Sequence, residues 1–314
     1  MPRTPSPSLV FRLRSAWSGL PGNLRGGLLI FLAAAIVALV SAAVKEAGRE
    51  MPTLMVVFFR SLFGMCLMLP FLARRGIGSL RTRRPVTHVA RIATGSLALF
   101  GGFYALTHLP LATAVAISFT KPLFMIFLAV LFLAERVRWR RWAATAAGFA
   151  GVLIIVRPGA SGVDPAALVA LGAALCVAGS MVLIKKLSAT EHPATMLIWL
   201  GIGTTLVTLP PALLVWETPS LYGIGLGLLI AVLTTIIQYL FIEAYRVGEA
   251  TAITPLDYAQ LPIAGLLGYL LFAETPDLWT WAGAAVIIGS NLYILHREAK
   301  LRAVGAAART EADA

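Results

Sequence analysis

The sequence contains little charge for its length. Of its 314 residues, 13% are Asp, Glu, Lys or Arg, whereas 59% are apolar. A typical soluble domain carries about 25% charged residues, so this chain lacks the charges to cover a water-exposed surface. Lipid, by contrast, can face apolar side chains directly. The composition therefore excludes an ordinary soluble domain and predicts an integral membrane protein.

Residues that form disulfides and metal centres are equally scarce. The chain has two cysteines and four histidines, and the histidines are scattered along it. A metal centre needs clustered His, Cys or carboxylate ligands, and no HExxH, CxxC or GxxxxGK run occurs. Cys66 and Cys176 both lie in apolar runs, so we interpret them as packing residues. The sequence predicts no metal, no cofactor and no disulfide.

The same absences weigh against two other classes of membrane protein. An enzyme that uses a serine nucleophile would need a base at the same depth in the membrane, and the sequence suggests no such pair. A channel usually has a filter-like segment or a ring of repeated charges, and neither is visible. A multi-span membrane enzyme and a channel therefore remain only as alternatives to the class favoured below, a secondary transporter that is not an enzyme.

The chain does contain ten long apolar stretches, separated by short connections rich in Pro, Gly and charge. Most of them approach the roughly 20 residues that a helix needs to cross about 30 Å of hydrocarbon. The first stretch is too long for the core of a cleaved signal peptide. The approximate limits of the stretches are 26–44, 54–73, 88–107, 112–133, 141–156, 165–184, 194–216, 222–245, 250–272 and 279–295.

The positive charges predict the orientation of these stretches. If the N-terminus lies in the cytoplasm, the cytoplasmic segments hold 21 of the 26 Lys and Arg residues, the opposite side holds three and the spans hold two. Such an excess marks the cytoplasmic side. We therefore expect a protein of the bacterial inner membrane, with the tails 1–25 and 297–314 both cytoplasmic. The net charge of +12 then faces anionic lipid and does not indicate a nucleic-acid partner.

The two halves of the chain resemble one another at an offset of 138–141 residues. For example, the run LFLAE at 131–135 resembles LLFAE at 270–274. Each half, 26–157 and 158–296, holds five apolar stretches, so two such halves in one chain must lie in opposite orientations. The predicted fold class is an all-α integral membrane protein with ten transmembrane helices in two inverted five-helix repeats. Many secondary transporters are built in this way.

Motifs in the fourth and fifth stretches resemble those of the EamA domain of the drug/metabolite transporter superfamily. They are PLATA at 110–114, PLF at 122–124 and LFLAER at 131–136, and the second half repeats the pattern over 250–289. The resemblance covers nearly the whole chain outside the two tails. It implies ten helices in two inverted repeats and the transport of small metabolites.

A further run, Asp257-Tyr258-Ala259-Gln260-Leu261, is similar to a branch of that family that includes carriers of S-adenosylmethionine and other organic solutes. The resemblance implies a partly charged substrate, such as an amino acid derivative, an S-adenosylmethionine-like solute or a vitamin-like solute. The sequence departs from the family where a glycine often precedes the acidic residue, because alanines stand there, at positions 134 and 273.

Two charged residues lie inside matching spans of the two halves. Lys121 and Asp257 each lie shortly before a proline, and charged groups in a bilayer are costly enough to need a reason. We expect both residues to line a shared cavity, where they bind the charged ends of a zwitterionic solute. The alternative is a permanent ion pair that only fixes packing.

Two more charged residues have a functional and a structural interpretation. Arg60 lies inside the second span, where its guanidinium would suit a substrate carboxylate or phosphate or would instead hold backbone carbonyls. Glu243 lies near the cytoplasmic end of the eighth span as an interfacial group or as a proton-coupling residue. Asp257 is the other candidate for proton coupling, and protons are thus a possible coupling partner.

Several uncharged residues complete the predicted substrate site. Aromatic rings and amides inside spans would stack on a solute or bind it through hydrogen bonds, although each alone is more often a packing or interhelical contact. Proline inside a helix removes a backbone donor and kinks the helix, which predicts gates in the fourth and ninth spans or, alternatively, static kinks. The substrate-site residues are Tyr104, Trp199, Gln238, Tyr258 and Gln260, and the gate residues are Pro122, Pro255 and Pro262. The sequence does not predict an oligomeric state.

Overall fold

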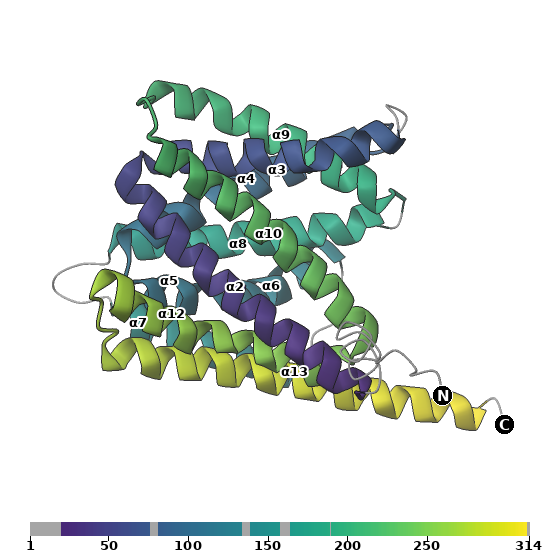
Figure 1. Cartoon of the computed structure of the whole chain (residues 1–314). Helices are drawn as coiled ribbons and strands as arrows, with labels where there is room; N and C mark the ends of the chain where they lie inside the picture. The colour runs from purple at the N-terminus through teal and green to yellow at the C-terminus, as the bar shows by residue number, and fades with distance from the viewer. Residues whose placement is uncertain (1–19, 76–80, 134–138, 158–163, 189, 313–314) are drawn as a thin grey trace, which may run out of the picture.

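The computed structural model describes residues 20–75, 81–133, 139–157, 164–188 and 190–312, and within these ranges every regular element is a helix (Figure 1). The helices of the first half are α2 (Gly22–Glu50), α3 (Thr53–Arg75), α4 (Pro85–His108), α5 (Leu111–Ser118), α6 (Lys121–Leu133) and α7 (Trp139–Val156). Those of the second half are α8 (Pro165–Ser188), α9 (Pro193–Leu214), α10 (Leu221–Val247), α11 (Ala250–Ile253), the 3₁₀ helix η2 (Thr254–Ala259), α12 (Gln260–Phe272) and α13 (Leu278–Ala312).

Each of the ten predicted stretches overlaps one helix or one broken helix. Eight segments of the described chain are long and apolar enough to cross a membrane, and one of them is α5 and α6 taken together, Leu111–Phe132. The two predicted stretches outside those eight are α7 and the segment α11–η2–α12. The chain is therefore an all-helical integral membrane protein, as its composition predicted.

The last helix is longer than expected. α13 continues to Ala312, whereas the predicted tenth stretch ended at residue 295 and a tail was predicted beyond it. The apolar part of this helix ends at His296. The beginning of α2 and the end of α13 lie at the same end of the bundle, at the right in Figure 1. The predicted N-terminal tail, 1–25, falls mostly outside the described residues.

The helices pack in pairs that bring small residues together. α2 packs along α10, α4 along α8, α3 along α9, and α7 along α13. A Cβ atom added at Gly151 of α7 would lie 2.7 Å from the carbonyl oxygen of Gly283 of α13, so these two backbones are in direct contact. Close backbone approach at small residues is the usual way in which membrane helices associate.

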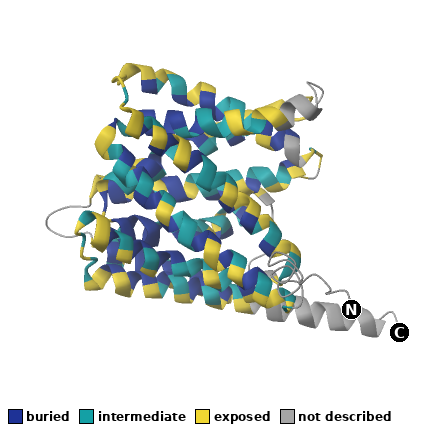
Figure 2. Cartoon of the chain, in the orientation of Figure 1, coloured by how far each residue is buried: buried dark blue, intermediate teal, exposed yellow. Residues whose placement is uncertain are grey.

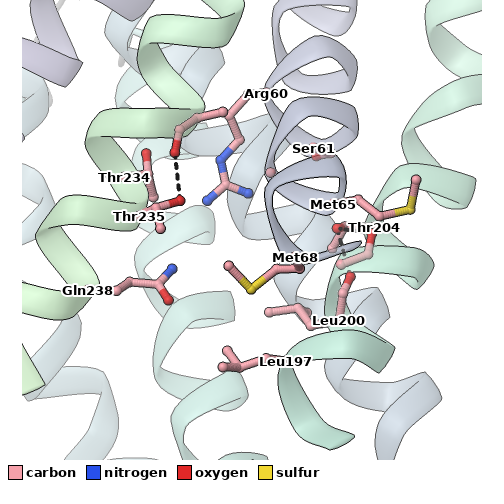
Figure 3. Close-up of a pocket in the computed structure, with 13 residues that line it drawn as sticks. Arg60, Ser61, Met65, Met68, Leu197, Leu200, Thr204, Thr234, Thr235 and Gln238 are labelled. Carbon is pink, nitrogen blue, oxygen red and sulfur yellow. Dashed lines mark hydrogen bonds between the residues drawn. The ribbon is translucent and has the colours of Figure 1, made fainter. Parts of the chain in front are cut away.

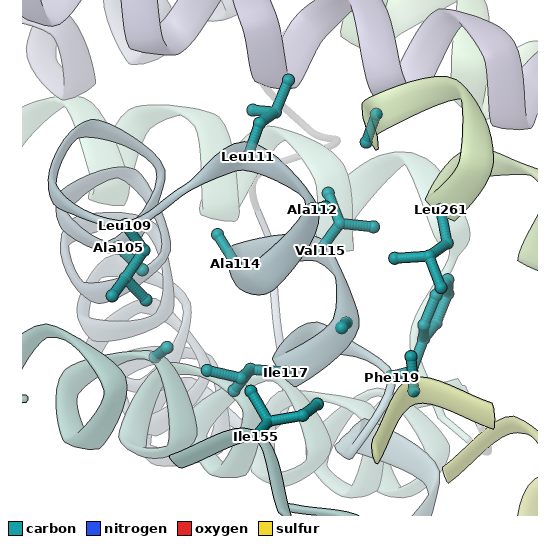
Figure 4. Packing of buried hydrophobic residues seen from close by; sticks show 14 of the residues in the cluster. Ala105, Leu109, Leu111, Ala112, Ala114, Val115, Ile117, Phe119, Ile155 and Leu261 are labelled. Atoms are coloured by element: carbon teal, nitrogen blue, oxygen red, sulfur yellow. The ribbon is translucent and has the colours of Figure 1, made fainter. Parts of the chain in front are cut away.

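Apolar side chains lie on both the inside and the outside of the bundle. Exposed residues lie on the periphery of the bundle (Figure 2). Many of them are large and apolar, for example Leu131, which is 72% exposed, and Leu221, which is 89% exposed. On a soluble protein such a surface would be an association hazard, but lipid can cover it. Inside, α5 is almost fully enclosed: Leu111 and Ile117 are 0% exposed, and Leu261 of α12 belongs to the same cluster (Figure 4).

Proline chemistry accounts for the two broken spans. A proline inside an α-helix lacks the amide hydrogen and clashes with the carbonyl four residues earlier. α5 ends at Ser118, four residues before Pro122, and α6 begins at Lys121. In the second half, Pro255 lies in the first turn of η2, which follows the four-residue helix α11. Both spans are thus divided where the prolines predicted a kink.

Candidate functional site

The two breaks lie against each other in the interior of the bundle. The ring of Phe119, at the end of α5, meets the ring of Tyr258, in η2, edge to face with centroids 4.9 Å apart. Both side chains belong to the same core region. Spans that are 140 residues apart in the sequence therefore place their irregular backbone at one site.

Side-chain hydrogen bonds support the break in the fourth span. The hydroxyl of Thr120 donates to the carbonyl of Ile117 at 2.7 Å. The side-chain amide of Asn291, on α13, donates to the carbonyl of Phe119 at 2.9 Å. Helix breaks free carbonyl groups that have no water to bind within a membrane. Asn291 meets this need, so it acts as an interhelical hydrogen-bond donor.

Lys121 and Asp257 follow these breaks directly. Lys121 is the first residue of α6, and Asp257 is the fourth residue of η2. Their charges interact, but no contact ion pair joins them among the described residues. One carboxylate oxygen of Asp257, Oδ1, is buried and has no hydrogen-bond partner in the described chain. The ammonium of Lys121 and the carboxylate of Asp257 therefore interact without direct contact.

A cavity of about 220 Å³ adjoins Lys121, and we call it the central cavity. Its walls come from α2, α4, α5, α6, α8 and α12, and most of the lining side chains are small or apolar. Its polar groups are those of Ser41, Ser118, Lys121 and Gln260. Gln260 is itself 5% exposed and lies one residue past η2. An apolar cavity with a few convergent polar groups is the usual form of a small-molecule site.

A polar network closes one end of the bundle next to this cavity. Lys45 of α2 donates to the carbonyl of Leu109 at 2.6 Å and forms an ion pair with Glu274. Glu274 also accepts from the amide of Leu111 at 2.7 Å. Lys45 lies four residues, or about one helical turn, beyond Ser41, which lines the cavity. The network thus joins α2, the α4–α5 connection and the segment after α12 one turn beyond the cavity.

Arg60 and Gln238 lie elsewhere. They line a second cavity of about 90 Å³ between α3, α9 and α10, which we call the Arg60 cavity (Figure 3). Ser61, Thr204 and Thr234 are among its other polar lining residues. The structure therefore does not bring Arg60 together with Lys121, although both were predicted to contact one solute.

Five other residues that were predicted to bind substrate or protons line neither cavity: Asp257, Tyr258, Tyr104, Trp199 and Glu243. Lys121 therefore lines the central cavity without Asp257. Tyr104 stacks on His108 with centroids 3.9 Å apart, and the ring of Trp199 lies 5.2 Å from that of His88. Glu243 forms an ion pair with Arg246 at 3.3 Å near the end of α10. Both interpretations of Tyr104, Trp199 and Glu243, functional and structural, therefore stay predictions.

The sequence did not predict the polar network that Lys45 and Glu274 form together. The family motif drew attention to Glu274, but Lys45 was counted only as one of the few charges on the side opposite the cytoplasm. Lys45 donates to the main-chain carbonyl of Leu109, and Glu274 accepts from the main-chain amide of Leu111. A main-chain carbonyl or amide is present at nearly every residue, so the sequence does not indicate which one is a hydrogen-bond partner. This network could therefore be identified only from the structure.

A bundle with an apolar surface, two spans broken beside a polar cavity and no described cluster of metal-binding residues has the construction of a membrane transporter. Comparison with known proteins agrees. Residues 24–157 and, again, residues 164–295 match the EamA-like transporter family. The chain belongs to this family, and it is a transporter, not an enzyme.

Its relatives carry small metabolites. The chain is 36% identical over 259 residues to the S-adenosylmethionine uptake transporter of Rickettsia bellii, a match that covers 82% of this chain and 88% of the relative. It is also 36% identical over 248 residues to the riboflavin transporter of Rhizobium johnstonii, with 79% and 82% covered. A solved structure titled "Crystal structure of protein" has the same fold, with a TM-score of 0.57, 19% identity, and 86% and 94% of the two chains covered.

Proposed function

We propose that this transporter moves a small, partly charged organic metabolite across the bacterial inner membrane by alternating access through the central cavity. The observation that carries the proposal is the proximity of two opposite charges, Lys121 and Asp257, at two helix breaks that contact each other. In transporters, discontinuous helices at mid-membrane bind substrate and coupling ions with the groups that the break exposes. A substrate bearing both an amino group and a carboxylate would satisfy both charges.

The proposed architecture is ten transmembrane helices in two inverted repeats of five, 26–157 and 158–296. The family matches twice, once in each half. The fourth and ninth spans are also both broken next to a proline, Pro122 in one and Pro255 in the other, which is expected of two related units. We propose cytoplasmic tails at both ends, 1–25 and 297–314, on the strength of the positive-charge bias.

The substrate class follows from the site together with the relatives. S-adenosylmethionine, named for one relative, and riboflavin, named for another, both carry a planar ring system. The edge-to-face pair Phe119–Tyr258 offers an aromatic surface beside the two charges. We propose an amino acid derivative, an S-adenosylmethionine-like or a vitamin-like solute. The central cavity is smaller than the roughly 300–1,000 Å³ of most ligand pockets, so it has to widen when the solute enters.

Alternating access requires closure of each side in turn, and the network of Lys45, Glu274 and the α4–α5 connection is the proposed closure of the outer side. Opening then requires that Lys45 and Glu274 separate. Pro122, Pro255 and Pro262 are the proposed hinge positions, since each lies within or beside a break. No nucleotide-binding loop is present in the sequence, so uphill transport would draw on a gradient. Protons are the proposed coupling ion, with Asp257 ahead of Glu243 as the carrier.

Transport by purified full-length protein in proteoliposomes tests the proposal. Labelled S-adenosylmethionine and riboflavin would be the first probes, followed by unlabelled amino acid derivatives and vitamins as competitors. We expect saturable uptake of at least one probe, absent from protein-free liposomes, and stimulation by an imposed proton gradient. Saturable counterflow without any effect of the gradient would leave facilitated exchange. If no member of the panel shows saturable uptake or competes, the proposed substrate class is wrong.

A further inference from the structure

The Arg60 cavity contains a guanidinium group for which the described residues supply no counter-charge. The guanidinium of Arg60 forms no hydrogen bond or ion pair with any described residue. None of the residues that line the cavity is a carboxylate. Arg60 lies seven residues into α3, or about 10 Å along the helix, so its charge lies below the level of the lipid headgroups. An uncompensated cation at such a depth is costly.

A second polar group in this cavity also lacks a partner. Ser61 is 2% exposed, and its hydroxyl oxygen has no hydrogen-bond partner within the described chain. Buried hydroxyl groups are normally bonded, and an exception calls for an explanation such as a missing ligand. The amide of Gln238, on α10, is directed into the same space as the guanidinium (Figure 3). Three potential donors from two helices therefore converge on one small cavity.

The threonines around the cavity do not change this balance. The hydroxyls of Thr204, Thr234 and Thr235 each donate to a carbonyl of their own helix, at 2.7, 2.7 and 2.9 Å. They are therefore already satisfied as donors. The donors left over are those of Arg60, Ser61 and Gln238, and a set of donors around a positive charge selects an anion.

The size of the cavity limits what that anion can be. A volume of about 90 Å³ is smaller than the roughly 150 Å³ of a cavity that holds one benzene molecule. It cannot take a whole metabolite with a ring system, but it has room for a carboxylate group or a halide ion. We propose that the Arg60 cavity is a second binding site, separate from the central cavity, that holds a single small anion or carboxylate group.

This inference goes beyond the proposed transport function and does not depend on it. The two cavities share no lining residue. A failure of anion binding at Arg60 would leave transport through the central cavity untouched. Conversely, a failure of metabolite transport would leave an anion site at Arg60 intact. The experiment below measures binding, so the two outcomes can be separated.

The test is a thermal-stability titration of the purified full-length protein in detergent. Sodium chloride, sodium formate and sodium acetate are the probes, and sodium gluconate, which is too large for the cavity, keeps the ionic strength constant. A ligand that binds only the folded state raises the melting temperature with concentration. A response to formate or acetate identifies a carboxylate site, and a response to chloride alone identifies a halide site.

Four variants make the titration specific. Arg60→Gln should weaken the apparent affinity about tenfold or more, because hydrogen bonds to charged groups are strong, and Ser61→Ala should weaken it several-fold. Arg49→Gln is the matched control, since Arg49 is exposed and already paired with Glu46, and it should titrate like the wild type. Lys121→Gln, in the central cavity, should do so as well.

Three results would overturn the inference. The first is a wild-type protein that responds to none of the probes beyond gluconate. The second is a response that persists in both Arg60→Gln and Ser61→Ala. The third is a response lost in Lys121→Gln, which would move the site to the central cavity. If Arg60→Gln does not fold, Ser61→Ala decides alone, because it removes only one oxygen atom from the side chain.

Discussion

The fourth and ninth spans are both helices broken beside a proline, but they differ in whether the polar groups at the break have hydrogen-bond partners. In the fourth span, Asn291 donates to the carbonyl of Phe119, and the hydroxyl of Thr120 donates to the carbonyl of Ile117, which also accepts the amide of Thr120. In the ninth span the break is longer, a six-residue 3₁₀ helix, and the Oδ1 atom of Asp257 is left buried without a partner in the described chain. The first break is thus held by the protein itself, whereas the second presents a carboxylate that still needs a proton, a cation or a solute.

This difference suggests that the two breaks have different roles, one in binding and the other in stability. Buried carboxylates that lack partners are costly, and a protein keeps them where an incoming group can compensate. The Phe119–Tyr258 contact joins the two breaks, so a change at the second reaches the first. We therefore expect substitution of Asp257 at the second break to affect transport most, and substitution of Asn291, which supports the first break, to affect mainly stability.

The largest effect is expected for Asp257→Asn, which removes the charge and keeps the shape. If Asp257 binds the cationic end of the solute or carries a proton, initial uptake in proteoliposomes should fall about 10–100-fold. Counterflow at equal pH separates the roles, because a lost proton carrier spares exchange of bound solute whereas a lost ligand does not. Asp277→Asn, at a carboxylate outside the spans that is already paired with Arg157, is the matched control. Uptake and gradient dependence like those of the wild type in Asp257→Asn would contradict both roles.

A smaller effect is expected for Lys121→Gln at the first break. The substitution removes the charge that would meet a carboxylate, so the solute concentration for half-maximal uptake should rise about tenfold. The charge swap Lys121→Asp with Asp257→Lys distinguishes binding from packing. A static ion pair predicts that the swap restores what each single change loses. Recovery of full transport in the double variant would therefore favour the structural pair over the proposed binding site.

The two broken spans also meet through Glu274, which follows the ninth span and bonds the first residue of α5, Leu111. Glu274→Gln should weaken closure and raise the population of the open form by up to about tenfold, the value of one charge-assisted bond. The population of the open form can be measured in intact cells with Ser41→Cys in a background with Cys66→Ser and Cys176→Ser. A larger open population should increase the rate at which this cysteine reacts with a membrane-impermeant maleimide.

Glu46→Gln is the matched control for this experiment, since Glu46 lies at the same end of the bundle and pairs only with Arg49 among the described contacts. It should leave the labelling rate unchanged. A rate in Glu274→Gln equal to that of the control would mean that the network does not close the outer side of the central cavity.

At the first break the expected loss is in stability. Asn291→Leu leaves the buried carbonyl of Phe119 without its donor, which costs about 1–3 kcal/mol of unfolding free energy. A lower melting temperature in detergent measures the loss. Ser290→Ala is the control on the neighbouring position, because the Ser290 hydroxyl is buried without a partner in the described chain and its removal should cost little. If transport in Asn291→Leu falls by more than the amount of folded protein does, the first break also takes part in transport. That result would contradict the proposed difference between the two breaks.

The sequence predicted most of this architecture but only part of the site. Apolar length and proline positions are local properties, so they located the ten stretches and both breaks, and the spacing of Lys121 and Asp257 located the two charges. Which helices meet in the interior is a tertiary property. For that reason Arg60 and Gln238 could not be assigned to a cavity of their own, and the main-chain partners of Lys45 and Glu274 remained invisible.

The smallest effect is expected outside the spans, at the connection that follows the ninth span. Burial tends to raise the pKa of Asp277, but hydrogen bonds from the side chain and main chain of Thr280 and the charge of Arg157 outweigh it and lower this pKa. A carboxyl with a lowered folded-state pKa contributes stability above its unfolded pKa of about 3.9 and loses it as the pH falls further. Because Asp277 and Arg157 are both exposed, the charge pair itself should contribute less than about 1 kcal/mol. The wild type should therefore lose a small stability advantage over Asp277→Asn between about pH 5 and pH 3, measured as a converging difference in melting temperature. A difference that stays constant over this range would show that Asp277 acts only as a neutral hydrogen-bond acceptor at the start of α13.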